Sequence, residues 1–469
     1  MKIKKLQNLY IYNKNNKKRY IKFHMPGNYG GKNLNKKFRK YMPFFETTEV
    51  YGTDDYHNPQ GIIKKAEKST AKLFNSNHCI YLVNGSSSGI IAAISYLFRE
   101  GDQILVSRDC HKSVIYGLIL SGAEPVFSEH SGASPLDYQG IQQAIKKIER
   151  IKGIILTTPN YYGIGNKDLK LIVQLCNKYK IKLLVDEAHG SHLYFTDLKV
   201  YLANTCKADL VVNSTHKNLT GLTQTGVINI NAEDINLSEL RKHISLTTST
   251  SPSYILLASI AYCTEQYTQI GEKILQKTIK KGNYMKELLD KYKIRYIKEK
   301  DLNSNQYLDP TKITLLFKDN KKAKEVFKQL IKNGIIPEFL ADNKILLFIN
   351  YKISKRELVK TAAILKRFST EEEDILYSQE NCFRIRNTGV LTPREAFYSQ
   401  KEKIPLKKAK GKVVVQPITP YPPGIPILFP GEVVTEEIIK YLKNSNFSSI
   451  HGIENGMIEV VKDKFFDDK

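Results

Sequence analysis

The centre of the chain contains two related segments, KIKLLVDEAHGSHL (180–193) and ADLVVNSTHKNLTGLTQTGV (208–227). Each segment contains a short apolar run of strand length, followed by polar and ionisable residues. The first polar cluster contains Asp186, His189 and His192, and the second contains Ser214, His216 and Lys217. We predict two buried strands of one sheet, with both clusters at the edge where the strands end.

A carboxylate and a lysine at neighbouring strand ends are the pair that pyridoxal phosphate requires. The lysine forms a Schiff base with the cofactor aldehyde, and the carboxylate keeps a proton on the ring nitrogen. Asp186 and Lys217 match this pair. From these residues alone, Asp186, His189 and His192 also suit a metal site, and Lys217 also suits a solvated strand end. A buried Asp186 needs a cation, which the protonated ring supplies, so we favour the cofactor.

Further apolar runs flank the two central strands. They lie at 79–84, 103–107, 124–127 and 153–159, and helical patterns separate the apolar runs of this region, including the central strands at 182–187 and 209–214. Runs of this length that alternate with helices indicate a mainly parallel sheet covered by helices on both faces. Ligands of such sheets bind at the C-terminal ends of the strands, which is where the ionisable clusters lie.

Two other strand ends carry candidate cofactor contacts. Asn84–Gly89 (NGSSSG) joins a strand to a helix, so small residues, hydroxyls and a helix N-terminus meet there, as in a phosphate site. An ordinary glycine-rich turn is the alternative interpretation. His111, in RDCHKS, follows the strand at 103–107. Its imidazole is a candidate to stack on a planar ring, with a surface or capping histidine as the alternative.

The bulk composition limits the class of protein. No apolar run has the length of about 20 residues that a membrane helix needs, and the lysine-rich start lacks the apolar core of a secretory signal. The six cysteines are far apart, which favours a reducing, cytoplasmic compartment over a disulfide framework. The net charge of +25 comes from lysines scattered along the chain. We therefore expect no specific nucleic-acid partner and no membrane partner.

The length of 469 residues predicts more than one domain. We expect an N-terminal arm over 1–40, a large cofactor-binding domain over 41–290, a small α+β domain over 291–375 and a C-terminal domain over 376–469. Ser354 and Glu357 predict a capping box at the start of the last helix of the small domain. The acidic run EEED (371–374) marks the boundary with the C-terminal domain.

Taken together, the motifs resemble the ornithine/lysine/arginine decarboxylases in their shorter bacterial form. The resemblance extends from Phe23 to Glu432 and rests on HMPGNYGG, GTDDYHNPQGIIKKAE, VNGSSSG, RDCHKSVIYGLILSGAEPVF, TTPNYYGI, VDEAHGSHL, STHKNLTGLTQTG, TSTSPSYILLASI, LTPREAF and PYPPGIPILFPGE. It implies an α/β fold of the aspartate-aminotransferase-like type (pyridoxal phosphate fold type I), with a mainly parallel central sheet. It also implies a small α+β domain, a C-terminal decarboxylase domain and a homodimer or higher homo-oligomer.

The same resemblance implies roles for individual residues. Lys217 matches the Schiff-base lysine, Asp186 the partner of the ring nitrogen, and His111 the stacking histidine. His189 matches a histidine near the cofactor's phenolic oxygen and the substrate carboxylate. The implied phosphate contacts are Ser86, Ser87, Ser214 and His216. The chain departs from the family at Asn28–Tyr29, where HKG is common, and at Ser86–Ser87, where Ser-Thr is common. The first departure leaves the contribution of the arm open.

The implied activity is decarboxylation of a basic amino acid. We favour arginine, giving agmatine and CO₂ in polyamine-related metabolism, over lysine or ornithine. A cationic substrate and a basic protein require a locally acidic pocket, for which Asp55, Glu395 and Glu432 are the candidates. The alternatives are another fold type I enzyme, such as an aminotransferase or lyase, and a non-catalytic descendant. The intact set of Asp186, His111 and Lys217 argues against a non-catalytic protein.

Overall fold

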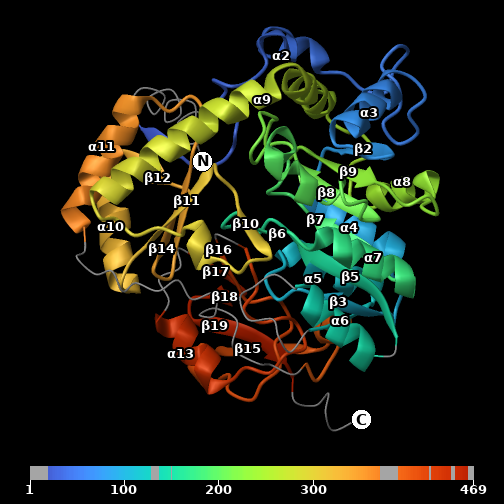
Figure 1. The fold of residues 1–469 in the computed structure, drawn as a ribbon. Coiled ribbons are helices and arrows are strands. Elements are labelled where there is room, and N and C mark those ends of the chain that lie inside the picture. Colours follow the sequence, from blue (N-terminus) through green and yellow to red (C-terminus); the bar gives the residue numbers. More distant parts are fainter. Residues whose placement is uncertain are drawn as a thin grey trace, which may run out of the picture.

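A computed structural model describes residues 20–127, 137–148, 150–369, 389–421, 424–444 and 449–462. Figure 1 shows a blue-to-green large domain, a yellow-to-orange small domain and a red C-terminal domain. The run EEED, Cys382, the first 19 residues of the arm and Pro422–Pro423 lie outside the described residues. Among the described helices, none combines the length and the apolar character needed to cross a membrane.

The large domain is built on a seven-stranded sheet. Its strands, in spatial order, are β2 (His78–Leu82), β9 (Gly226–Ile230), β8 (Leu210–Ser214), β7 (Lys182–Asp186), β5 (Ile151–Thr157), β3 (Gln103–Val106) and β4 (Glu124–Val126). All neighbouring strands are parallel except that β9 is antiparallel to both β2 and β8. The mainly parallel sheet predicted from the sequence is therefore present, and the reversed strand β9 was not foreseen.

Side chains of the sheet alternate between two cores because successive residues of a strand point to opposite faces. In β7, Leu184 packs in the core formed with α4 (Gly85–Leu97), α5 (Lys112–Ser121) and α8 (Leu237–Ser245). Leu183 and Val185 pack in the other core, formed with α6 (Tyr138–Lys147) and α7 (Leu169–Tyr179). Both faces are thus covered, and the sheet edge at the strand ends remains for polar residues.

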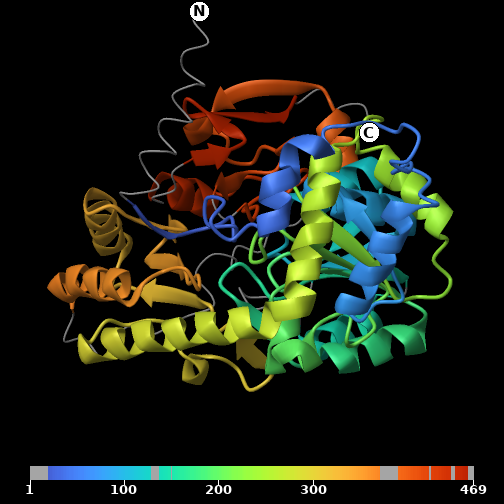
Figure 2. The same cartoon turned by 90° about the horizontal axis from the view of Figure 1, so that it is seen from above.

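The small domain follows the long helix α9 (Tyr254–Lys291), which reaches it from the large domain (Figures 1 and 2). Its antiparallel sheet has the order β11 (Lys312–Leu316), β14 (Lys344–Phe348) and β13 (Phe339–Ala341). The helices α10 (Asn320–Lys332) and α11 (Lys355–Leu365) complete it. The predicted capping box at Ser354 and Glu357 is confirmed at the start of α11.

The arm joins the two domains. Its strand β1 (Ile21–Phe23) pairs in parallel with β12 (Ile335–Pro337) of the small domain. The chain then passes to the loop that carries Lys217, where Gly27 N–H donates to the His216 carbonyl at 3.0 Å. The division of the chain into four parts stays a prediction, but residues 21–33 pack on both the large and the small domain.

The C-terminal domain contains the sheet β15 (Lys401–Pro405), β19 (Met457–Val461) and β18 (Ile453–Glu454), with the helices α12 (Pro393–Tyr398) and α13 (Glu436–Asn444). A buried ion pair of 2.5 Å between Arg108 Nη1 and Glu432 Oε1 joins it to the large domain. A second contact joins the same two domains, because the Lys112 N–H donates to the Gly424 carbonyl at 3.2 Å. The C-terminal domain therefore borders the loop that carries His111.

Candidate active site

Lys217 and Asp186 end neighbouring strands, as predicted. Asp186 is the last residue of β7, and Lys217 lies in the loop between β8 and β9. Burial lowers the pKa of the Lys217 ammonium, while the charges of Asp186 and Glu338 raise it. Burial raises the pKa of Asp186, which the Lys217 charge and the Ala188 N–H counteract. A partly desolvated lysine with a lowered pKa is a usable nucleophile.

His189 is the direct neighbour of Lys217. Its Nε2 atom lies 2.9 Å from Lys217 Nζ. Burial, and then the positive charge of Lys217, lower the pKa of His189, so the ring is neutral and its Nε2 atom can exchange a proton with Lys217. Its Nδ1 atom is buried and has no hydrogen-bond partner in the described chain. A buried polar atom without a partner at a strand end indicates a ligand contact.

The predicted phosphate contacts come together in part. Helix α4 begins at Gly85, and Ser86 Oγ lies 2.8 Å from Ser214 Oγ at the end of β8. Ser87 is exposed on the first turn of the same helix. His216 Nδ1 lies 2.7 Å from the Thr225 carbonyl oxygen and so holds the lysine loop closed. Ser86 and Ser214 thus face each other beside a helix N-terminus, which is suited to an anion.

His111 lies at the end of the loop after β3. It caps α5, because its Nδ1 atom accepts from the Ser113 N–H at 3.2 Å. Burial, and then the charge of Lys217, lower the pKa of His111 to about 3. A Cβ added at Gly424 would lie 3.2 Å from the ring, so the C-terminal domain contacts one side of it. The neutral ring is compatible with stacking and also fills the capping role that was the alternative.

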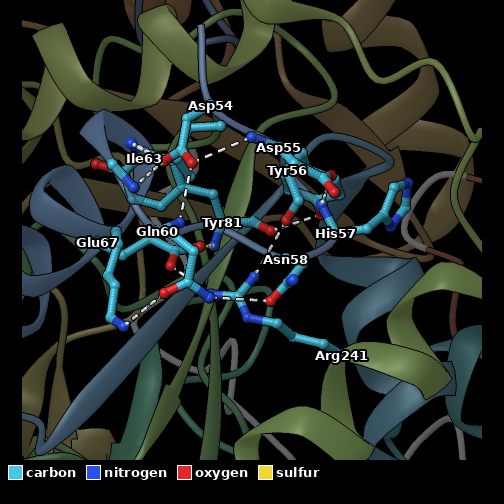
Figure 3. A network of polar contacts seen from close by, with 12 residues as sticks. Asp54, Asp55, Tyr56, His57, Asn58, Gln60, Ile63, Glu67, Tyr81 and Arg241 are labelled. Carbon is cyan, nitrogen blue, oxygen red and sulfur yellow. Dashed lines mark hydrogen bonds and ion pairs between the residues drawn. The ribbon is translucent and has the colours of Figure 1, made fainter. Parts of the chain in front are cut away.

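The three candidate substrate carboxylates have other partners within this chain. Asp55 is exposed and accepts from the His57 N–H at 2.8 Å, in a loop fixed by the network in Figure 3. Glu395 accepts from the Thr392 N–H at 2.9 Å and forms the capping box of α12. Glu432 is ion-paired with Arg108. Their role in substrate binding stays a prediction, and none is drawn toward Lys217 by a described contact.

The network in Figure 3 explains how the Asp55 loop is held. The Asp54 carboxylate accepts from the N–H groups of Gly61 and Ile63 at 2.8 and 2.9 Å. Glu67 accepts from the Tyr81 N–H at 3.0 Å and pairs with Arg241. These bonds are structural, because they satisfy N–H groups at the start of α3 (Ile62–Leu73) and the Tyr81 N–H of β2.

Two site features were missed from the sequence. The first is a buried cluster behind the histidines, where His192 Nε2 lies 3.0 Å from Asp309 Oδ2 and Lys312 Nζ lies 3.7 Å from the same oxygen. His192 is therefore paired with Asp309. In the described part of the chain, no group of three or more His, Cys, Asp and Glu side chains is placed to hold a metal ion.

The second missed feature is Glu338 of the small domain. Its Oε1 atom accepts from the Tyr161 hydroxyl at 2.8 Å, and its Oε2 atom accepts from the Met25 N–H at 2.7 Å. The Tyr161 ring lies 4.6 Å from the His189 ring. TTPNYYGI was recognised as a motif, but no local pattern around Glu338 separates it from a solvated glutamate.

The arm contributes directly to this region. Asn28 Nδ2 donates to the Gly221 carbonyl at 3.2 Å, and Asn33 Nδ2 donates to Asn350 Oδ1 at 3.0 Å. His24 and Gly27 line a pocket with Lys217 and His192. The departure at Asn28 therefore lies in a segment that touches the lysine loop, and its side chain is used to fix that segment.

Comparison with known proteins agrees with the geometry. The chain matches the family described as Orn/Lys/Arg decarboxylase, through its major domain over residues 7–357 and its C-terminal domain over residues 377–451. It is 31% identical over 453 residues to an arginine decarboxylase of Bacillus anthracis, covering 92% of this chain and 90% of that protein. To an arginine decarboxylase of Bacillus subtilis (strain 168) it is 30% identical over 467 residues, covering 95% of each.

A solved structure supports the fold. The constitutive lysine decarboxylase of E. coli aligns with a TM-score of 0.74 at 19% identity, covering 97% of this chain and 81% of that one. At this identity the likeness concerns the fold alone. The predicted fold class is confirmed.

Proposed function

Because the chain belongs to the Orn/Lys/Arg decarboxylase family, we propose that it is a pyridoxal-phosphate-dependent decarboxylase that converts arginine to agmatine and CO₂. The observation that carries the choice of arginine is the similarity, over more than nine-tenths of the chain, to two proteins named arginine decarboxylase. Lysine and ornithine are the other substrates to be tested, because the family name includes them.

The residues at the strand ends fit the cofactor. Asp186 supports a protonated ring nitrogen, Lys217 is the amine for the aldehyde, and Ser86 and Ser214 with the start of α4 suit the phosphate. His111 suits one face of the ring. When bound, the cofactor supplies an electron sink for the electron pair that CO₂ leaves behind.

Side chains beside the cofactor site carry the protons that the reaction requires. Burial lowers the pKa of Lys217, which favours the unprotonated Nζ atom that acts as a nucleophile and as a base. His189 Nε2, at 2.9 Å, takes or returns the proton of Lys217 Nζ. After CO₂ has left, Lys217 or His189 returns a proton to the substrate Cα. Asp186 and His189 are both buried, which limits the contact of these two side chains with solvent.

A side-by-side assay tests the function. Purified protein loaded with pyridoxal phosphate is given arginine, lysine and ornithine, and CO₂ and keto-acid release are both measured. We expect CO₂ with the highest kcat/KM for arginine, and no turnover with a loss of the cofactor absorbance band in Lys217→Ala. Keto-acid release without CO₂ would indicate an aminotransferase. Failure of the purified protein to bind the cofactor would refute the proposed enzymatic function.

We also propose a homodimer in a reducing, cytoplasmic compartment. Phe44, Val50, Tyr51 and Leu246 are largely exposed apolar side chains of the kind that a second copy would cover. The five cysteines of the described residues are all free and buried, which suits a reducing compartment. The mass in solution measured by light scattering tests the dimer, and Tyr51→Glu with Leu246→Glu is expected to yield monomers.

A further inference from the structure

Glu338 brings a negative charge from the small domain to the lysine site. It lies between β12 and β13, and a chain of contacts leads from it to Lys217. Its carboxylate accepts from Tyr161, the Tyr161 ring lies against His189, and His189 contacts Lys217 Nζ. Its charge raises the pKa of both Lys217 and Lys312, so the carboxylate is within electrostatic reach of both amines.

The hydrogen bonds of Glu338 leave its charge available. Both donors are neutral, because one is the Met25 backbone and the other is the Tyr161 hydroxyl. Burial, and then the charge of Glu338, raise the pKa of Tyr161, so this hydroxyl stays protonated and donates. An ionised carboxylate can accept about four hydrogen bonds, and Glu338 receives two in the described structure. The residue is half-buried, so it is not sealed inside the core of the small domain.

Of the two carboxylates that act on Lys217, Glu338 is the one free for the substrate. Asp186 is assigned to the cofactor ring, whereas Glu338 belongs to a different domain and has no such role. No described contact connects Asp55, Glu395 or Glu432 to the lysine site, whereas Glu338 is connected to it through Tyr161 and His189. The protein has a net charge of +25, so a cationic amino acid needs a local negative charge to bind.

We propose that Glu338 binds the cationic side-chain group of the substrate and is the residue that selects basic amino acids. This inference rests on the proposed function, because it takes the substrate to be a basic amino acid. A guanidinium or ammonium group accepts no hydrogen bonds and needs an acceptor with a full charge. The Tyr161 and Met25 donors hold the carboxylate in place for that contact.

The test compares Glu338→Gln with the wild type, using arginine and its neutral isostere citrulline. Kinetics and equilibrium binding to the cofactor-loaded protein are both measured. We expect the KM and Kd for arginine to rise about 10-fold to 100-fold, with little change in Kd for citrulline. The cofactor absorbance band should be retained. An arginine-to-citrulline preference that stays within about 2-fold of the wild type overturns the inference.

Two controls separate charge from structure. Tyr161→Phe removes one of the two donors that position the carboxylate but keeps its charge, so the preference for arginine should fall less than in Glu338→Gln. Glu325→Gln removes an exposed charge on α10 and should change neither constant.

The failures of the two proposals are distinguishable. If the wild type releases CO₂ from arginine and Glu338→Gln keeps its preference, the function stands and the inference fails. If no basic amino acid is decarboxylated but arginine binding depends on Glu338, the function fails and the inference stands. If the loaded protein binds no amino acid, both fail.

Discussion

Removing the charge of Asp309 should strongly destabilise the protein. Asp309, Lys312 and His192 are buried together, and Lys312 Nζ has no hydrogen-bond partner in the described structure. Asp309 Oδ2 lies 3.0 Å from His192 Nε2 and 3.7 Å from Lys312 Nζ. In Asp309→Asn, a buried ammonium group loses its anion. Breaking a buried pair in this way costs about 3–5 kcal/mol.

The pKa of Lys312 predicts the direction in which stability changes with pH. Burial lowers the pKa of Lys312 from 10.5 to about 8. Between these values the unfolded chain binds the proton and the folded chain does not, so the stability contributed by Lys312 rises with pH. At 1.36 kcal/mol per pH unit, the full penalty below pH 8 is about 3 kcal/mol.

The ionisation of Asp309 stabilises the folded protein, in contrast to that of Lys312. Burial opposes its ionisation, but His192 and Lys312 hold the pKa of Asp309 well below its usual value. Its contribution to stability is therefore present at neutral pH and is lost only in acid. As pH rises, Lys312 loses its proton in both proteins. The free energy of unfolding of Asp309→Asn should therefore approach that of the wild type.

Urea unfolding at about pH 7 and about pH 9.5 tests this reasoning. The double variant Asp309→Asn with Lys312→Met should lose less stability than Asp309→Asn alone, since it has no buried charge without a partner. Asp234→Asn is the matched control, because its 2.6 Å pair with Lys182 is exposed and its loss costs less than about 1 kcal/mol. A loss below about 1 kcal/mol in Asp309→Asn, or a loss that does not shrink at alkaline pH, refutes the reasoning.

Two further substitutions test how the parts of the chain are held together. In Gly27→Ala the new Cβ would lie 2.1 Å from the Leu219 carbonyl oxygen, so we expect the arm to move away from the lysine loop. The free energy of unfolding in urea should fall by about 1–3 kcal/mol, and cofactor binding should weaken. Gly389→Ala, whose Cβ would meet nothing closer than 3.5 Å, is the control, and equal effects of the two would contradict this account. In Arg108→Met the buried Glu432 loses its cation, which should cost about 3–5 kcal/mol and expose the C-terminal domain to protease; unchanged protease resistance would show that the ion pair does not hold the domain.

The large domain was predictable because its strands are short apolar runs with helices between them. The predicted run at 182–187 is strand β7 at Lys182–Asp186, and the run at 209–214 is β8 at Leu210–Ser214. The direction of β9 was not predictable. An apolar run has the same pattern in either direction, and only pairing with β2 and β8 decides the direction.

The site was predictable where its residues follow strands and not where it depends on contacts distant in sequence. Asp186 and Lys217 follow two successive strands of a parallel sheet, so their proximity comes from the sheet itself. Glu338 reaches the site only because the small domain folds against Tyr161, 177 residues earlier. Its sequence neighbours are ordinary small-domain core residues. A site carboxylate contributed by another domain can be identified only from the three-dimensional arrangement of the two domains.

The reversed strand β9 has a consequence for how the protein can vary in length. The segment that carries Lys217 is closed by ladder pairing of Ser214 with Gly226 and, just inside, by a 2.7 Å bond from Thr215 Oγ1 to Thr225 Oγ1. Both ends are fixed, so an inserted or deleted residue would shift the register or carry Lys217 Nζ away from His189. The connections between neighbouring parallel strands, such as β5 to β7 and β7 to β8, cannot be closed by pairing of their two ends in this way. Related chains should therefore gain and lose residues in those loops and keep one length between Ser214 and Gly226.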